Sequence, residues 1–129
     1  MRTEYITQPQ LPVGKAGNIA LWILQFVVAA AFLMAGAAKL SSQPMMVEEF
    51  ARLGSGQWFR YFTGGLEVGA AVLLLVPRLA ALGAFLLVCT MLGAITAHLL
   101  KLGGSPVAAI VLLLFSLAIA WGRKSRLSI

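Results

Sequence analysis

Four long apolar runs, separated by short polar or Gly- and Pro-containing connections, dominate the pattern of the chain. The runs cover residues 19–40, 58–76, 79–100 and 106–121. A helix rises about 1.5 Å per residue, so roughly 20 apolar residues cross a bilayer core of about 30 Å. The pattern therefore predicts an all-α, polytopic membrane protein whose four transmembrane helices form an up-down bundle with both termini on one side.

The longest connection, between the first two runs, contains a short segment with helical periodicity. Met46, Phe50 and Leu53 are spaced i, i+4, i+7 and form an apolar stripe, while the positions between them are mostly polar. We predict a short amphipathic helix over Pro44–Leu53, lying on the bundle or in the membrane interface. It could be a lid over a site or an ordinary connecting helix.

The composition agrees with a membrane-embedded chain. Of the 129 residues, 60% are hydrophobic and 11% are charged, and the mean hydropathy is +0.93. A soluble domain averages about 25% charged residues. We expect the lipid bilayer as the main partner of one domain over 19–122, preceded by a flexible polar tail at 1–18 and followed by a basic tail at 123–129. The polar start and long first run do not resemble a signal peptide, so we expect that run to persist as a helix.

The net charge of +6 is divided between the two expected sides of the membrane. The side with the termini and the second connection would carry Arg2, Lys15, Arg78, Arg123, Lys124 and Arg126. The opposite side would carry Lys39, Arg52, Arg60 and Lys101, offset by Glu48 and Glu49. This distribution favours cytoplasmic termini by the positive-inside rule. Because basic residues stand at the ends of apolar runs, no nucleic-acid partner is expected.

One carboxylate, Glu67, lies inside the second apolar run. An ionisable group there costs roughly 2.5–3.5 kcal/mol on insertion scales, so it usually faces a partner or a polar cavity. Gly65 and Gly69 are four residues apart, a spacing that allows a second helix to approach closely. We therefore expect Glu67 to point into the bundle.

Two other polar side chains fall in the same half of the membrane. Glu67 is about 13 Å from the outer end of its helix by helical rise, while Lys39 and His98 are near the outer ends of the first and third runs. Thr90 shares a helical face with His98, and Met91 adjoins that face. We predict a ligand-binding pocket formed by these residues, with apolar walls that include Phe32, Phe62 and Met91.

Simpler structural roles are open for the same residues. A Lys–Glu pair can fix helix register without binding anything. Lys39 can extend its side chain to the lipid headgroups, and His98 can be an ordinary interfacial histidine. Whether Lys39 and Glu67 form a structural ion pair or a functional site is not decided by their spacing.

The chemistry available to the chain alone is narrow. Cys89 is the only cysteine, which excludes thiol–disulfide exchange within the chain, and its mid-helix position predicts a buried structural thiol. No haem, iron–sulfur or dinucleotide motif is present, and no metal site or catalytic residue is assigned. The pocket could hydrogen-bond an amphipathic head group and pass protons, but a redox role would require a partner subunit or a bound cofactor.

Several segments together resemble the DoxX-like family of small four-helix membrane proteins. The resemblance spans about residues 20–121 and is carried, in order, by Ala35-Gly36-Ala37-Ala38-Lys39-Leu40, Phe50-Ala51-Arg52-Leu53-Gly54, Gly65-Leu66-Glu67-Val68-Gly69-Ala70, Leu73-Leu74-Leu75-Val76-Pro77-Arg78, Thr90-Met91-Leu92-Gly93-Ala94 and His98. The Gly-x-x-Lys-Leu, Gly-x-Glu and Met-x-x-Ala elements are fairly specific in this order and weak singly.

The resemblance implies a four-helix protein of a bacterial inner membrane. Some members of the family are subunits of quinone-linked oxidoreductases, and others act in the assembly of partner proteins. Three functions are therefore considered. The first is a redox-associated subunit that binds a quinone-like or other hydrophobic small molecule. The second is a non-enzymatic assembly protein for a partner complex, and the third is a small transporter of a hydrophobic or weakly acidic compound. A partner subunit or a homo-oligomer fits each of them.

Overall fold

The computed structural model describes residues 14–124, and these residues are helical with no strand among them. The elements are α2 (Lys15–Leu40), α3 (Pro44–Leu53), α4 (Gln57–Leu74), α5 (Ala80–Ala97), a π-helical turn η2 (His98–Leu102) and α6 (Val107–Arg123). The predicted all-α class is confirmed, and the short helix α3 occupies the predicted residues. Helices α2 and α6 extend into the predicted tails at 1–18 and 123–129, since α2 begins at Lys15 and α6 ends at Arg123. The rest of both tail predictions, at 1–13 and 125–129, lies outside the described residues.

Two stretches are long and apolar enough to cross a membrane. They are α2, with 26 residues, and the continuous helical stretch Ala80–Leu102, with 23. The apolar helix α6 has only 17 residues, and α4 carries Arg60 and Glu67 within its 18 residues. By length and composition, the structure therefore supports two of the four expected spans.

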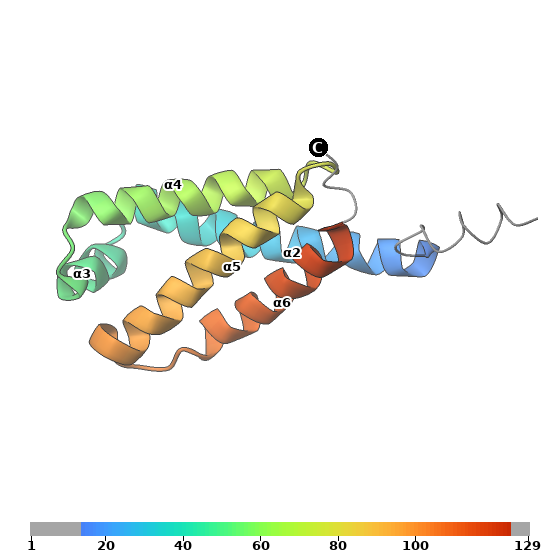
Figure 1. Cartoon of the computed structure of the whole chain (residues 1–129). Helices are drawn as coiled ribbons and strands as arrows, with labels where there is room; N and C mark the ends of the chain where they lie inside the picture. Colours follow the sequence, from blue (N-terminus) through green and yellow to red (C-terminus); the bar gives the residue numbers. More distant parts are fainter. Residues whose placement is uncertain (1–13, 125–129) are drawn as a thin grey trace, which may run out of the picture.

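The long helices pack in chain order as neighbours. α2 lies along α4, α4 packs against α5, and α5 lies along α6, while α2 and α6 make a smaller contact (Figure 1). The short helix α3 lies across the end of the bundle where α2 finishes and α4 begins (Figure 1). This arrangement places the polar ends of α2, α4 and α5 beside α3.

Glycine allows close contact between α2 and α4, but at a different residue from the one predicted. A Cβ on Gly36 would lie 2.8 Å from the backbone oxygen of Gly64, and Gly65 and Gly69 have nothing within 4 Å of an added Cβ. The predicted role of Gly65 and Gly69 is therefore wrong. Gly64 precedes Glu67 by three residues and shares its face, whereas residues two apart point in different directions.

α4 and α5 touch most closely near the turn that joins them. A Cβ on Gly83 would lie 2.7 Å from the backbone oxygen of Ala70, so no larger residue fits there without a shift. From this contact the two helices diverge toward the end that carries α3 (Figure 1). The core fills the space near the contact with Val28, Phe32, Ala71, Leu74, Ala84, Leu87 and Ile119.

A buried polar network ties three helices together at the end away from α3. Gln25 Nε2 donates to the backbone oxygen of Leu74 at 2.6 Å, and its Oε1 accepts from Arg123 Nε at 2.6 Å. Arg123 Nη1 also donates to Asn18 Oδ1 at 2.6 Å. Gln25 is fully buried and Arg123 is 2% exposed, so hydrogen bonding within the protein replaces water around both side chains.

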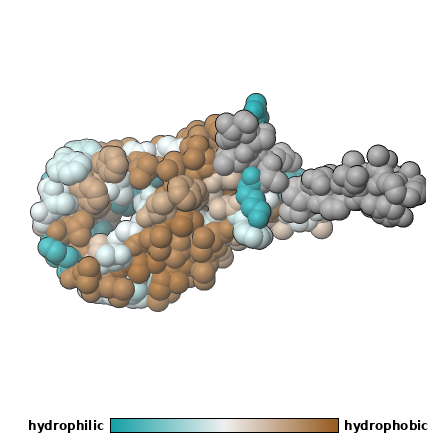
Figure 2. Space-filling view, in the orientation of Figure 1, coloured by the Kyte–Doolittle hydropathy of each residue, from teal (hydrophilic) through white to brown (hydrophobic). Residues whose placement is uncertain are grey.

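The outer surface is largely apolar. Large hydrophobic side chains are exposed on both α5 and α6, including Phe85, Leu92, Leu114 and Trp121. Figure 2 shows a broad hydrophobic face over these two helices. A contiguous apolar surface of this kind indicates contact with lipid or with another protein.

Adding a methyl group at Gly36 should destabilise the bundle. The Cβ of Gly36→Ala would lie 2.6 Å from Val68 Cγ2 and 2.8 Å from the Gly64 backbone. Overpacking of this kind costs about 1–3 kcal/mol. The measurement is the free energy of unfolding by SDS titration in mixed micelles.

The matched control is Gly65→Ala, which adds a methyl group on the same pair of helices where nothing lies within 4 Å. It should be neutral or raise the free energy of unfolding by up to about 1 kcal/mol, since alanine favours a helix. Equal destabilisation by both substitutions would contradict the assigned contact.

Candidate ligand-binding site

Glu67 forms an ion pair with Lys39 between α4 and α2. Lys39 Nζ lies 3.0 Å from Glu67 Oε1, and the two side chains are 13% and 3% exposed. Within residues 14–124, Lys39 is the only cation within ion-pair distance of this carboxylate. The close approach of Gly36 and Gly64 brings the two helices near enough for the pair. The structure therefore places the two predicted residues in direct contact.

Arg60 secures the end of α2 that carries Lys39. Its Nη1 donates to the backbone oxygen of Lys39 and, at 3.0 Å, to Ser42 Oγ, while its Nε donates to Gln57 Oε1 at 2.6 Å. The side chain is only 3% exposed. A guanidinium suits this position because the carbonyl groups at a helix C-terminus attract positive charge.

Arg60 was predicted only as one of the charges facing the outer side. Its first-turn position in α4 gives no indication that it reaches back across 21 residues to Lys39. The side chain is nevertheless buried and bonded to the chain on both sides of α3. Arg60 thus positions the backbone from which the Lys39 ammonium reaches Glu67.

A cavity of about 360 Å³ opens beside the ion pair. It lies where α4 and α5 diverge, is covered at its end by α3, and also receives side chains from α2, η2 and α6. The surface is hollowed near the α3 end (Figure 2). All five residues of the predicted pocket line this cavity: Lys39, Glu67, Thr90, Met91 and His98.

The predicted apolar walls also line the cavity, together with further aromatic rings. Phe32 is 1% exposed and Phe62 is 57% exposed, so one is an inner wall and the other lies at the edge. Phe59 stacks on Phe62 with ring centroids 6.1 Å apart, and its centroid is also 6.1 Å from that of Phe50. These rings make the cavity suitable for a flat, apolar ligand.

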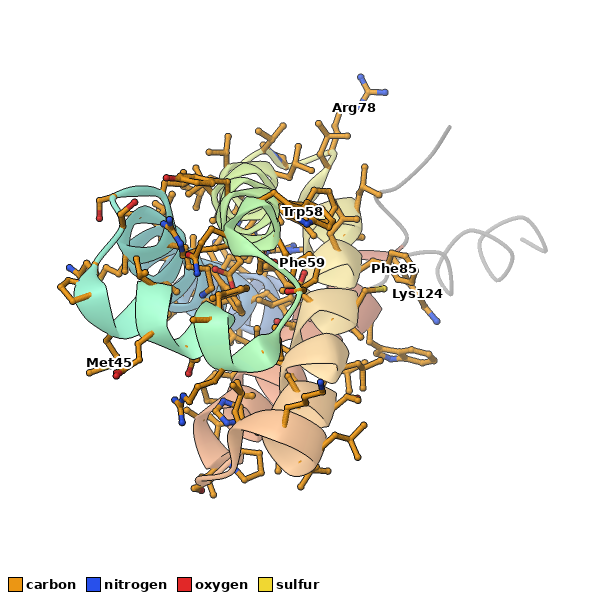
Figure 3. The ribbon with its side chains drawn as sticks, turned by 90° about the vertical axis from the view of Figure 1, so that its left-hand side faces the viewer. Met45, Trp58, Phe59, Arg78, Phe85 and Lys124 are labelled. Carbon is orange, nitrogen blue, oxygen red and sulfur yellow. The ribbon has the colours of Figure 1, made fainter. Side chains whose placement is uncertain are left out.

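Figure 3 views the molecule from the α3 end of Figure 1. Trp58 and Phe59 lie together at the start of α4, with ring centroids 5.5 Å apart, and Met45 points away from the bundle. Trp58 is 66% exposed, as expected of an aromatic residue at a membrane interface. Its indole is thus next to the aromatic edge of the cavity.

His98 begins the π-helical turn that ends the third long helix. Its Nδ1 lies 3.0 Å from the backbone oxygen of Gly103, whose own N–H donates to the backbone oxygen of His98 at 2.9 Å. Gly103 has a φ of 69°, which favours glycine. This closed turn holds the imidazole at the cavity.

One expectation about a polar residue is wrong, and two polar residues of the lining were missed. Cys89 is exposed and lines the cavity, so the predicted buried thiol is wrong. It is two residues from each of the buried residues Leu87 and Met91, and residues two apart in a helix point in different directions. Glu49 of α3 and Thr63 of α4 also line the cavity and were not predicted to do so.

The site is therefore an amphipathic cavity. Aromatic and aliphatic side chains make up most of its lining, and the Lys39–Glu67 pair, Thr90 and His98 supply polar atoms. Within residues 14–124, no group of three His, Cys, Asp or Glu side chains could hold a metal ion. The geometry can bind a small molecule with a ring and a polar end, and it can exchange protons with that end.

These features define a helical, membrane-associated protein with one amphipathic cavity beside a buried ion pair. The chain belongs to the DoxX-like family, because the sequence model of that family matches residues 23–122. This match confirms the resemblance seen in the sequence. No curated protein and no solved structure matches the chain.

Replacing Arg60 should loosen the end of α2. Arg60→Ala removes three part-buried hydrogen bonds from a charged donor, to Lys39, Ser42 and Gln57, which costs about 1–3 kcal/mol in the free energy of unfolding. Arg60→Lys should recover only part of the lost free energy of unfolding, because lysine lacks the planar guanidinium group with its several fixed donors. Unfolding by SDS titration provides the measurement.

Arg52→Ala is the matched control, since Arg52 is an exposed arginine on α3. Its effect should stay within about 0.5 kcal/mol. If Arg60→Ala behaved like Arg52→Ala, the assigned anchoring of α2 would be incorrect.

Proposed function

We propose that this chain is a four-span protein of a bacterial inner membrane that binds a quinone-like molecule as a redox-associated subunit. The observation that carries the proposal is the cavity of about 360 Å³ with a buried Lys–Glu pair on its wall. Ligand pockets typically have volumes of roughly 300–1,000 Å³, mostly apolar walls and a few polar groups that orient the ligand. The cavity has each of these properties.

The residues fit a substituted quinone-type ring. Phe32, Phe50, Phe59 and Phe62 offer apolar and stacking surface for the ring. The polar substituents of the ring would meet the Lys39 ammonium and the Glu67 carboxylate. A ring oxygen can accept a hydrogen bond from the ammonium, and a ring hydroxyl can donate one to the carboxylate. A bound quinone would supply two-electron, two-proton redox chemistry.

This chain's own contribution is binding and proton exchange. Glu67 and His98 can accept or return a proton at the ligand oxygens, since carboxylates and imidazoles are common general acids and bases. The sequence has no haem, iron–sulfur or dinucleotide motif. A partner subunit would therefore exchange the electrons, which agrees with the role of a redox-associated subunit.

The proposed four-span arrangement assigns a side of the membrane to each connection. With α2, α4, the stretch Ala80–Leu102 and α6 all crossing, the α4–α5 turn lies with the termini, and α3 lies on the other side. The exposed Arg78 in that turn and Lys124 at the end of α6 would then share one side. The positive-inside rule makes this side cytoplasmic.

Single cysteines in a Cys89→Ala background test this topology. Ser55→Cys and Ser105→Cys, both at exposed positions in outer connections, should react with a membrane-impermeant maleimide on intact cells. Arg78→Cys should react only after permeabilisation, which also serves as the control for its reactivity. Reaction of Arg78→Cys on intact cells would contradict cytoplasmic termini.

Quinone titration of the protein in lipid nanodiscs tests the binding site. Trp22→Phe/Trp121→Phe protein retains Trp58, whose ring lies near Phe59 and Phe62 at the cavity edge. A short-chain quinone should quench its fluorescence saturably. Glu67→Gln should weaken binding of the corresponding hydroquinone, kept reduced under anaerobic conditions, by about tenfold, because the ligand hydroxyl loses a charged acceptor.

Glu48→Gln is the matched control, as it makes the same chemical change at an exposed position of α3 outside the cavity lining. Its dissociation constant should equal that of the parent protein. Saturable binding that is unaffected by Glu67→Gln, or no saturable binding at all, would contradict the proposed site. The second result would favour the assembly function.

A further inference from the structure

The polar groups around the cavity are unevenly divided between hydrogen-bond donors and acceptors. The hydroxyl of Thr90 donates to the backbone oxygen of Leu86 at 2.8 Å. With its hydrogen used within α5, Thr90 Oγ1 presents only lone pairs to a ligand. It is therefore an acceptor in the cavity.

His98 is restricted in a similar way. Its Nδ1 is 3.0 Å from the backbone oxygen of Gly103, and a carbonyl oxygen can only accept. Nδ1 therefore carries the hydrogen. In the neutral ring the other nitrogen, Nε2, is then an acceptor.

Two carboxylates add further acceptors. Glu67 is 3% exposed, and Lys39 is its only cation partner among the described residues. Glu49 lines the cavity from α3 and forms no ion pair within residues 14–124. Ionised carboxylates accept hydrogen bonds and donate none.

The donors are fewer. The Lys39 ammonium lies 3.0 Å from Glu67 Oε1. The Thr63 hydroxyl can donate or accept a hydrogen bond, and the Cys89 thiol is a weak donor. A ligand hydroxyl can donate to Glu67 and accept from Lys39 at once, so it bridges the ion pair. A ligand carbonyl can only accept and leaves the acceptors around it unpaired.

We propose that the cavity is specific for lipophilic aromatic alcohols, that is phenols and hydroquinones, over quinones of the same shape. The inference rests on the proposed function and narrows its ligand class to the reduced form. Glu67, Thr90 and His98 accept the ligand hydroxyls, and Phe32, Phe59 and Phe62 hold the ring. A site built to bond a hydroxyl discriminates strongly against an analogue that lacks it.

Three probes of one ring shape test the specificity. Calorimetric titration of the full chain in nanodiscs compares decyl-ubiquinone, its hydroquinone kept reduced under anaerobic conditions, and the dimethyl ether of that hydroquinone. Titration of empty nanodiscs corrects for partition into lipid. The hydroquinone should bind about tenfold or more tighter than the other two probes.

Two variants show which atoms cause the preference. Thr90→Val retains the shape of the side chain but removes one acceptor, and it should reduce the preference at least about threefold while leaving quinone affinity unchanged. Glu67→Gln should reduce the preference further, because the amide can also donate to a quinone. Thr96→Val is the control, since the Thr96 hydroxyl donates to Leu92 on the same helix and lies outside the cavity lining.

The outcomes separate the two proposals. A quinone that binds as tightly as the hydroquinone, or a preference that Thr90→Val and Glu67→Gln leave intact, overturns the hydroxyl specificity and leaves the quinone-type site standing. Saturable binding by none of the three probes overturns both the specificity and the proposed function.

Discussion

The burial of one carboxylate beside one ammonium is the constraint on which the rest of the structure depends. Glu67 lies in the interior of an apolar bundle, where an isolated charge would be costly, and Lys39 is its partner at 3.0 Å. For the pair to form, α2 and α4 must approach each other closely, and the absence of a Cβ at Gly36 and Gly64 allows this approach. It also requires the last turn of α2 to be held in place, which Arg60 does through its bond to the Lys39 carbonyl.

The cavity follows from the same packing. α4 lies along α2, with a close glycine contact at Gly36 and Gly64, but it approaches α5 at Gly83, beside the turn that joins these two helices. α5 therefore leaves α4 toward the end that carries α3 (Figure 1). Glu67 faces α2 and also borders the resulting space. A single helix thus brings the polar pair and the apolar walls together, and α3 covers their open end.

The sequence predicted the helical class, the bounds of α3 and some of the residues that line the cavity. Depth along each helix can be counted from helical rise, which explains why Lys39, Thr90, Met91 and His98 were placed correctly in space. Which side of a uniformly apolar helix faces inward cannot be counted in this way, so the mid-helix position of Cys89 wrongly predicted a buried thiol.

Contacts between distant residues were also missed. Arg60 reaches back 21 residues to Lys39, and Arg123 reaches back 98 residues to Gln25. Such contacts depend on the tertiary packing of α2, α4 and α6, and no local periodicity reports them. In both cases the sequence shows only an arginine near one end of an apolar run.

The network of Gln25, Arg123 and Asn18 has a consequence for how the cavity is reached. It binds α2, α4 and α6 to one another at the end away from α3, and the apolar core fills the bundle between the network and the cavity. The interior is thus closed at the end that carries this network and open toward α3. A molecule that enters beside α3, or between the diverging helices α4 and α5, leaves by the same opening.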